Sequence, residues 1–198
     1  MKRPSPKPAG FTLVELLLVI TIITILAGLT FAMLGFAERK AKTERAKGEV
    51  NALSLAIEAY KIDNGDYPRD PNTDAATVDP QRTPLTTIST ASTPVMLSSV
   101  TLYKALSGDI NLDGIPGDTV AGSKSKIYFD FKKKMLHFNS ANTVDAIVDP
   151  FRNAYGYSTI GSTTNSNGIQ AGGYNPTFDL WSTADDSTVN QNIWIKNW

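Results

Sequence analysis

A run of 26 residues, Phe11 to Phe36, constrains this chain more than any other feature. It holds 19 apolar residues and a single charged one, Glu15. As a helix, at about 1.5 Å per residue, the run is roughly 39 Å long, and the hydrocarbon core of a membrane is about 30 Å thick. The alternative, a buried helix of a globular core, is disfavoured because nothing later in the chain is apolar enough to surround it. The run therefore predicts a membrane-spanning helix.

The residues before this run have the composition of a short leader. They include Lys2, Arg3 and Lys7 but no acidic residue. Positive charge favours the cytoplasmic side of a membrane, so we expect a cytoplasmic amino terminus and a translocated carboxy-terminal part. Basic residues just beyond the run weaken this signal: Arg39, Lys40, Lys42, Arg45 and Lys47. A cleaved secretory signal has a shorter apolar stretch followed by a small residue, whereas here the small residue, Gly10, comes first.

Glu15 is unusual because a carboxylate inside a membrane costs about 2.5 to 3.5 kcal/mol. The alternative to a functional role is a stray acid that reaches the interface. The string from Gly10 to Glu15 resembles the class III signal of type IV pilins and type II secretion pseudopilins. The resemblance implies that a prepilin peptidase cuts after Gly10, that the new amino terminus of Phe11 is methylated, and that Glu15 directs assembly. Where many relatives carry a proline, this chain has Ala32, so we expect a continuous helix.

The sequence predicts an α+β, pilin-like fold, in which a long amino-terminal helix packs on a small antiparallel sheet with long loops. Beyond the anchor, the apolar residues Val50, Leu53, Ile57 and Tyr60 recur at helical spacing, and Asn64-Gly65 ends the helix. The expected organisation is a cleaved leader (1–10), a transmembrane and fibre-core helix (11–36), an amphipathic helical spine (37–65) and a head (66–198).

Within the head, the stretch 66–101 is rich in proline and small polar residues and predicts an irregular connection. A short helix is expected at 102–106. Residues 127–131 and 135–138 predict a hairpin closed by a solvated turn at Lys132–Lys134.

Later segments narrow the resemblance to the major pseudopilin of type II secretion. They are the DNGDYP string at 63–68, the DPFRNAYGY string at 149–157, the FDLWS string at 178–182 and the closing Asn197-Trp198. Residues 66–145 are expanded relative to that family.

Two loops contain candidate calcium ligands. The resemblance implies a carboxy-terminal calcium site at Ser182, Asp185 and Asp186, although the acidic pair that relatives offer before the closing residues is missing here. The other loop, Asp109-x-Asn111-x-Asp113-Gly114, matches the start of an EF-hand loop, with Asp118 in place of the final glutamate. The alternative for this loop is a set of Asx turns that form without an ion.

Composition excludes several other classes of protein. The chain has no cysteine, which excludes disulfide scaffolds, thiol nucleophiles and cysteine-ligated zinc or iron–sulfur sites. Its 19 basic and 19 acidic residues give no basic surplus for nucleic acid. The single histidine, His137, is expected to be structural, and no phosphate-binding loop or nucleophile motif occurs. We therefore expect no enzymatic activity.

These features predict a subunit of a type II secretion pseudopilus that drives protein export as a homo-oligomeric fibre. The expected partners are the prepilin peptidase, an inner-membrane assembly platform, minor pseudopilins, and membrane lipid before assembly. The expected location is the inner membrane, crossed once, with a periplasmic or extracellular head. The alternatives are a type IV pilus subunit or minor pilin adhesin, and a membrane-tethered binding module that does not polymerise.

Overall fold

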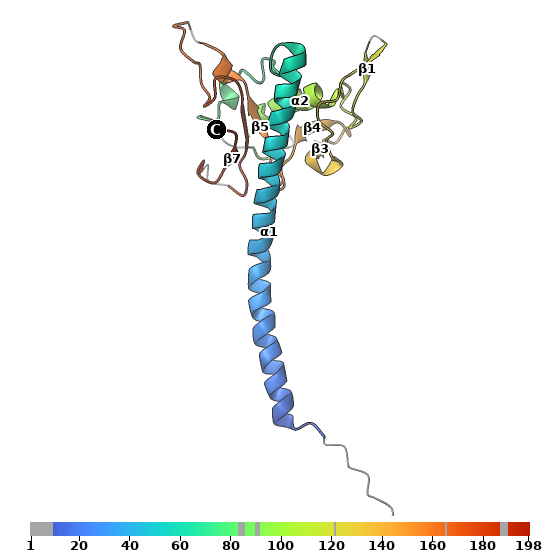
Figure 1. Ribbon diagram of the computed structural model, residues 1–198, viewed down its shortest axis with the longest axis vertical. Helices are drawn as coiled ribbons and strands as arrows, with labels where there is room; N and C mark the ends of the chain where they lie inside the picture. Colours follow the sequence, from blue (N-terminus) through green and yellow to red (C-terminus); the bar gives the residue numbers. More distant parts are fainter. Residues whose placement is uncertain (1–9, 83–85, 90–91, 121, 165, 187–189) are drawn as a thin grey trace, which may run out of the picture. The chain divides into compact units, whose positions relative to one another are not determined.

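The structure is a computed structural model that describes residues 10–82, 86–89, 92–120, 122–164, 166–186 and 190–198, without the side chains of residues 31–34. The chain forms two compact units, Met1–Ala41 and Lys42–Trp198, which we call the amino-terminal unit and the head unit. Helix α1 (Leu13–Asn64) contributes to both (Figure 1). Each unit is described by itself.

Helix α1 is 52 residues long and helical without a break, as the absence of proline predicts. It begins at Leu13, two residues later than the apolar run, because Thr12 caps its first turn. It ends as predicted: Gly65 adopts φ 84° and its amide donates to the carbonyl of Lys61 at 2.8 Å. A residue with positive φ at this place is the usual way for a helix to end, and glycine adopts it without strain.

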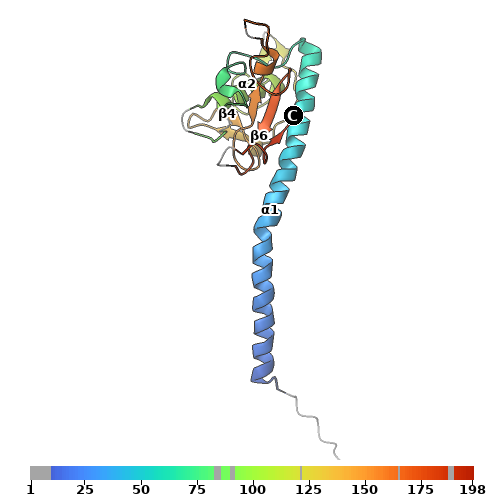
Figure 2. The same ribbon diagram turned by 90° about the vertical axis from the view of Figure 1, so that its left-hand side faces the viewer.

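In the head unit, α1 buries the predicted apolar face. Val50, Leu53 and Ile57 are at most 2% exposed, and Tyr60 packs against the same core. The hydroxyl of Tyr155 donates to Glu49 at 2.8 Å, which ties a buried tyrosine to the helix. Figure 2 shows the other elements of the head unit on one side of this half of α1.

The second helix, α2 (Pro94–Ser107), corrects the prediction of an irregular stretch through residue 101 with a short helix at 102–106. Proline was interpreted there as a helix breaker, but Pro94 occupies the first turn of α2, where an N–H group has no partner in any case. The hydroxyl of Thr93 accepts the amide of Met96, and Gly108 ends the helix with φ 65°.

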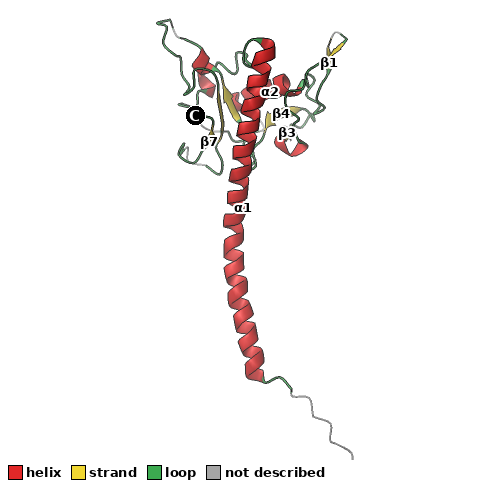
Figure 3. Ribbon diagram, in the orientation of Figure 1, coloured by secondary structure: helices red, strands yellow, loops and turns green. Residues whose placement is uncertain are grey.

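In the described residues the strands form three small antiparallel sheets, and long loops connect them (Figure 3). The sheets pair β1 (Thr119–Val120) with β2 (Ser123–Lys124), β3 (Leu136–Phe138) with β4 (Val144–Ile147), and β5 (Gly156–Ser158) with β6 (Asp179–Ser182) and β7 (Ile195–Lys196). The described part of the head unit also contains three short 3-10 helices: η1 (Ala76–Val78), η2 (Lys133–Met135) and η3 (Ile160–Ser162). A long helix followed by small antiparallel sheets confirms the predicted α+β, pilin-like fold.

The predicted hairpin of residues 127–131 with 135–138 is wrong. The first segment forms no strand, because the amides of Tyr128 and Phe129 donate to the carbonyl of Leu106, at 2.7 and 3.0 Å. The second segment pairs forward with β4 instead. The lysines between them are exposed, as a solvated turn predicts.

Candidate processing and assembly site

The first turn of α1 is closed by a capping box between Thr12 and Glu15. The amide of Thr12 donates to Oε2 of Glu15 at 2.9 Å, and the Thr12 hydroxyl donates to the same oxygen at 2.8 Å. The amide of Glu15 donates in return to Thr12 Oγ1 at 3.2 Å. These bonds satisfy N–H groups that the start of a helix leaves without partners.

The capping box adds a residue that our interpretation of the sequence missed. Glu15 was predicted to direct assembly, and the structure shows that it also organises the start of its own helix with Thr12. The Thr-x-x-Glu spacing is a recognised signature of such a box and could have identified Thr12 from the sequence. Both bonds to the carboxylate use Oε2, so Oε1 can accept a bond from another group.

The predicted cleavage site lies outside the helix. Gly10 and Phe11 precede the capping residue, and Phe11 is 81% exposed. A methyl group added at Gly10 would meet nothing within 4 Å. The Thr12 amide belongs to the Phe11–Thr12 peptide bond, so a cut after Gly10 would leave every atom of the capping box in place. Processing at Gly10–Phe11 stays a prediction.

Helix α1 is, within the described residues, the one helix long and apolar enough to cross a membrane. Its apolar side chains near the amino terminus are strongly exposed, from 44% at Val19 to 77% at Leu13. Three threonines in this part, Thr21, Thr24 and Thr30, donate their hydroxyl protons to carbonyls one turn back, so their polar groups are satisfied within the helix. This is what an apolar solvent requires of a helix.

The predicted EF-hand-like loop is held by its own hydrogen bonds. Asp109 is fully buried, and its carboxylate accepts the Tyr103 hydroxyl at 2.7 Å and the amides of Leu112 and Gly114 at 2.7 and 2.8 Å. Asp118 Oδ2 accepts two further amides at the start of the loop, those of residues 110 and 111. The buried setting and the adjacent carboxylate raise the pKa of Tyr103.

The middle of this loop has the bonds of Asx turns. Asn111 Oδ1 accepts the amide of Asp113 at 2.9 Å, and Asp113 Oδ1 accepts the amide of Ile115 at 2.8 Å. These are the contacts that the ion-free alternative predicts.

The carboxy-terminal loop also directs its predicted ligands toward protein groups. Ser182 is buried and its hydroxyl donates to Asp149 Oδ2 at 2.5 Å. Asp186 accepts the indole N–H of Trp194 at 3.0 Å, and Asp185 is exposed. The Trp194 ring stacks on Trp181, with ring centroids 6.3 Å apart.

The oxygen-rich composition of both loops suits calcium, but groups of the chain itself already hydrogen-bond to predicted ligands in both loops. Across the described ranges, no three His, Asp or Glu side chains gather in a group that could hold a metal. Most of the predicted carboxylates already accept protons from the chain itself. Calcium binding therefore stays a prediction from the sequence pattern.

Asp149 is a structural residue that sequence reasoning did not single out. It is 1% exposed, and its Oδ1 accepts the amides of Phe151 and Asn153 at 2.8 and 2.9 Å. Burial raises the pKa of Asp149 to about 6, and its hydrogen bonds oppose this shift only in part. Asp149 thus fixes the turn between β4 and β5 and holds Ser182 beside it.

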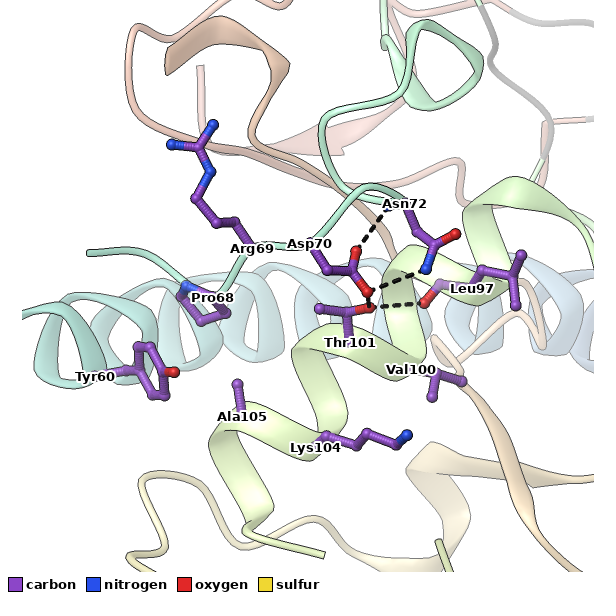
Figure 4. A pocket seen from close by; sticks show the side chains of 10 residues that line it. All are labelled: Tyr60, Pro68, Arg69, Asp70, Asn72, Leu97, Val100, Thr101, Lys104 and Ala105. Atoms are coloured by element: carbon purple, nitrogen blue, oxygen red, sulfur yellow. Dashed lines mark hydrogen bonds between the residues drawn. The ribbon is translucent and has the colours of Figure 1, made fainter. Parts of the chain in front are cut away.

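The groups that could suggest catalysis have structural roles. His137 lies in β3 as predicted, and its Nδ1 is 2.6 Å from Asp145 Oδ1, next to a bulge in the β3–β4 pair. A pocket between α1, α2 and the loop after α1 contains a carboxylate, Asp70, but that group bonds Asn72 and Thr101 (Figure 4). Its role is to attach the loop to α2.

Comparison with known proteins identifies the amino-terminal part of the chain. Residues 6–31 match the family model described as the prokaryotic N-terminal methylation motif. The type II secretion system core protein G of Escherichia coli is 41% identical over 66 residues, which cover 33% of this chain and 46% of the relative. The same core protein of Pseudomonas aeruginosa is 40% identical over 60 residues, 30% of this chain and 42% of the relative. That of Vibrio cholerae is 39% identical over 62 residues, 31% of this chain and 42% of the relative.

The chain thus spans less than half the length of these curated relatives. No solved structure matches it. The fold, the capped apolar helix and the methylation motif define a chain of pilin-like architecture, whose α1 is long and apolar enough to cross a membrane. Within that class it resembles the type II secretion system core protein G, the major pseudopilin. This resemblance supports a pseudopilin subunit.

Proposed function

We propose that this chain is a structural subunit of a type II secretion pseudopilus and that it assembles through α1 into a fibre that drives protein export. One observation supports this most strongly: an exposed apolar helix begins with the Thr12–Glu15 capping box, inside a methylation motif at residues 6–31. A helix of this kind is stable in a lipid bilayer or in a bundle of similar helices, and polymerisation replaces the first by the second.

The capping box suggests how one carboxylate can serve two contacts. Glu15 Oε2 remains bonded to Thr12, while Oε1 accepts the positively charged amine of Phe11 from a neighbouring processed subunit. In a bundle of low dielectric constant this attraction is strong, and a buried Glu15 without its partner would be costly. The pair would therefore select the alignment of neighbouring subunits.

The proposal gives the chain two forms: a membrane-anchored precursor and a processed subunit in a fibre. The precursor is anchored in the inner membrane by residues 11–36, with residues 1–10 in the cytoplasm and the head unit on the other side. A prepilin peptidase removes the leader after Gly10 and Phe11 is methylated. An inner-membrane assembly platform and minor pseudopilins then extract the subunit from lipid into the fibre.

The experiment compares the unaltered chain with Glu15→Ala in a cell that contains the peptidase and the assembly platform. We expect both precursors to be shortened by ten residues, with a methylated Phe11 detected by mass spectrometry, and only the unaltered chain to give fibres in sheared fractions by electron microscopy. Glu44→Ala is the matched control, because Glu44 is an exposed acid on the same helix that lies outside the capping box.

Three outcomes would contradict the proposal. Fibres of normal abundance from Glu15→Ala would show that Glu15 has no role in assembly. Export that continues without the chain, together with surface filaments that require it, would assign it to a type IV pilus instead. A chain that is anchored and processed but never polymerises would be a tethered binding module.

A further inference from the structure

The exposed side of α2 borders two adjoining hollows in the surface of the head unit. The first, of about 410 Å³, lies between α2 and the loop residues from 68 to 72 (Figure 4). The second, of about 260 Å³, lies between the last turn of α2 and the segment around Tyr128. Tyr60, Lys104 and Ala105 border both hollows, which makes the two continuous. We call the two hollows together the α2 groove.

The α2 groove follows from the spacing of side chains on α2. Leu97, Thr101 and Lys104 are four and three positions apart, which places them on one face of the helix. Leu97 borders the first hollow and is 40% exposed. Ile110, just beyond the helix, borders the second hollow and is 51% exposed. Each hollow therefore has an exposed apolar side chain of its own, and Lys104 is common to both.

The groove contains two polar groups that have no partner among the described residues. The ammonium group of Lys104 makes no ion pair or hydrogen bond there, and the hydroxyl of Tyr60 makes no hydrogen bond. The other two cations of the lining, Arg69 and Lys126, are each paired with an aspartate. Lys104 is therefore the cation that a ligand can reach, with the Tyr60 hydroxyl as a second donor.

The carboxylate of the lining, Asp70, is already occupied by other donors. Its Oδ1 accepts the amides of Asn72 and Thr73 at 2.8 and 3.1 Å. Its Oδ2 accepts the Thr101 hydroxyl at 2.7 Å and the Asn72 side-chain amide at 3.0 Å. Four bonds fill the capacity of a carboxylate. A ligand for Lys104 must bring its own acceptor, and an anion is favoured because a hydrogen bond between charged groups is about twice as strong as a neutral one.

The distance between Lys104 and the apolar side chains indicates an extended occupant. Leu97 and Lys104 are seven residues apart on α2, which is roughly 10.5 Å along the helix. About three residues of an extended chain, at about 3.3 Å each, cover this length. A carbohydrate would bring no apolar side chains, and an isolated anion would cover neither Leu97 nor Ile110. A peptide with one carboxylate between two apolar side chains matches all three positions.

We propose that the α2 groove binds an extended acidic peptide segment of another protein. A glutamate or aspartate of the segment bonds Lys104 and Tyr60, and an apolar side chain about three residues to either side occupies each hollow. The site uses none of residues 11–36, through which the chain is proposed to assemble, so it is a recognition function of the head unit beyond the proposed function.

A synthetic peptide of seven residues tests the chemistry of the occupant. It has leucine at both ends, glutamate in the centre and serine elsewhere, with a dye on the amino terminus and an amidated carboxy terminus. Fluorescence anisotropy measures its binding to the full chain in detergent. We expect saturable binding that weakens at least fivefold when glutamine replaces the glutamate, and at least fivefold when serine replaces both leucines. Equal binding of either altered peptide would overturn the proposal.

Substitutions in the chain test where the peptide binds. Lys104→Glu should weaken binding at least fivefold, whereas Lys134→Glu, the same change at an exposed lysine outside the groove, should leave it unaltered. Leu97→Ser should weaken binding several-fold, and Ile169→Ser, at an isoleucine that is 62% exposed in a loop, should not. A peptide with a central lysine should bind Lys104→Glu better than it binds the unaltered chain. Absence of that gain would overturn the contact with Lys104, and the gain itself shows that the variant is folded.

Competition separates the acidic peptide from other occupants. Release of the labelled peptide by an excess of unlabelled Lys104→Glu chain would show that a second copy of this chain fills the groove. Release by sucrose would show that the groove prefers a carbohydrate. We expect neither, and either result would overturn the proposal. Because none of these measurements requires fibres, failure of the chain to assemble would remove the proposed function and leave peptide binding in place.

Discussion

The Thr12 hydroxyl donates to Oε2 of Glu15 at 2.8 Å, so the residue predicted to direct assembly also caps the start of its own helix. Glu15 therefore has two roles: its side chain caps the first turn of α1, and its carboxylate places a negative charge at the start of the helix. A negative charge near the amino-terminal end of a helix is also favoured by the helix dipole. The two roles can be separated by substitution.

Glu15→Gln should retain the cap and remove the charge, since glutamine also serves at the third position of a capping box. We expect this variant to be processed normally and to give no fibres. Thr12→Val removes both hydroxyl bonds and retains the charge, and loss of a capping side chain costs about 1 kcal/mol. It should therefore give fewer fibres without abolishing them. Electron microscopy of sheared fractions measures both, and normal fibres from Glu15→Gln would show that the cap alone matters.

Asp149 should make the stability of the head unit depend on pH. Burial raises the pKa of Asp149 to about 6 in the folded chain, against an ordinary value of 3.8. The folded state therefore binds this proton more tightly than the unfolded state does, and ionisation of the group favours unfolding. Its contribution to stability is fully present below about pH 4 and is lost as the pH rises through about 6, an effect of about 2 to 3 kcal/mol.

Asp149→Asn tests this contribution because it keeps an acceptor for the amides of Phe151 and Asn153 without a charge. Thermal melts of the full chain in detergent at pH 4 to 7 should be less dependent on pH in the variant than in the unaltered protein. Burial also raises the pKa of Asp179, which acts in the same direction and should leave a residual dependence. Parallel pH profiles for the two proteins would contradict the assignment.

Gly156 should tolerate no side chain. It pairs with Trp181 across β5 and β6, and a methyl group there would lie 2.0 Å from Cε2 of the fully buried indole. Because the ring is packed on all sides, we expect Gly156→Ala to destabilise the head unit by about 3 kcal/mol or more. Gly48→Ala is the matched control: it lies in exposed helix with nothing within 4 Å, and alanine should stabilise it by about 0.5 to 1 kcal/mol. Denaturant unfolding measures both, and an equal effect would refute the packing argument.

The parts of this fold that could be predicted from sequence are those governed by local periodicity and by local backbone chemistry. The exposed apolar part of α1, its buried face with Val50 and Leu53, and the helix end at Gly65 all follow from such patterns. The segment from Ile127 to Phe131 could not be predicted in this way. Its β-branched and aromatic residues match a strand, but its amides bond to the distant carbonyl of Leu106, and only the folded chain brings the two together.

The contacts around the candidate functional residues also differ in whether the sequence predicts them. Glu15 and Thr12 are three residues apart, so their spacing in the sequence predicts the capping box. Asp149 is 33 residues from Ser182, and nothing in the sequence near either residue reports that their side chains are 2.5 Å apart in the core. Buried polar residues of this kind depend on tertiary packing, which no local pattern encodes.

Calcium binding is tested by measuring the melting temperature of the full chain in detergent, with added calcium and with a chelator. The hydrogen bonds of the loop from Asp109 to Asp118 lead us to expect an unmoved melting temperature. The Asp109 carboxylate accepts three bonds from its own chain and Asp118 Oδ2 accepts two, so an ion would have to replace protons that are already in place. Asp109→Asn should then destabilise the loop equally with and without calcium. If the EF-hand-like sequence pattern is instead the better guide, calcium raises the melting temperature by several degrees and Asp109→Asn removes that rise.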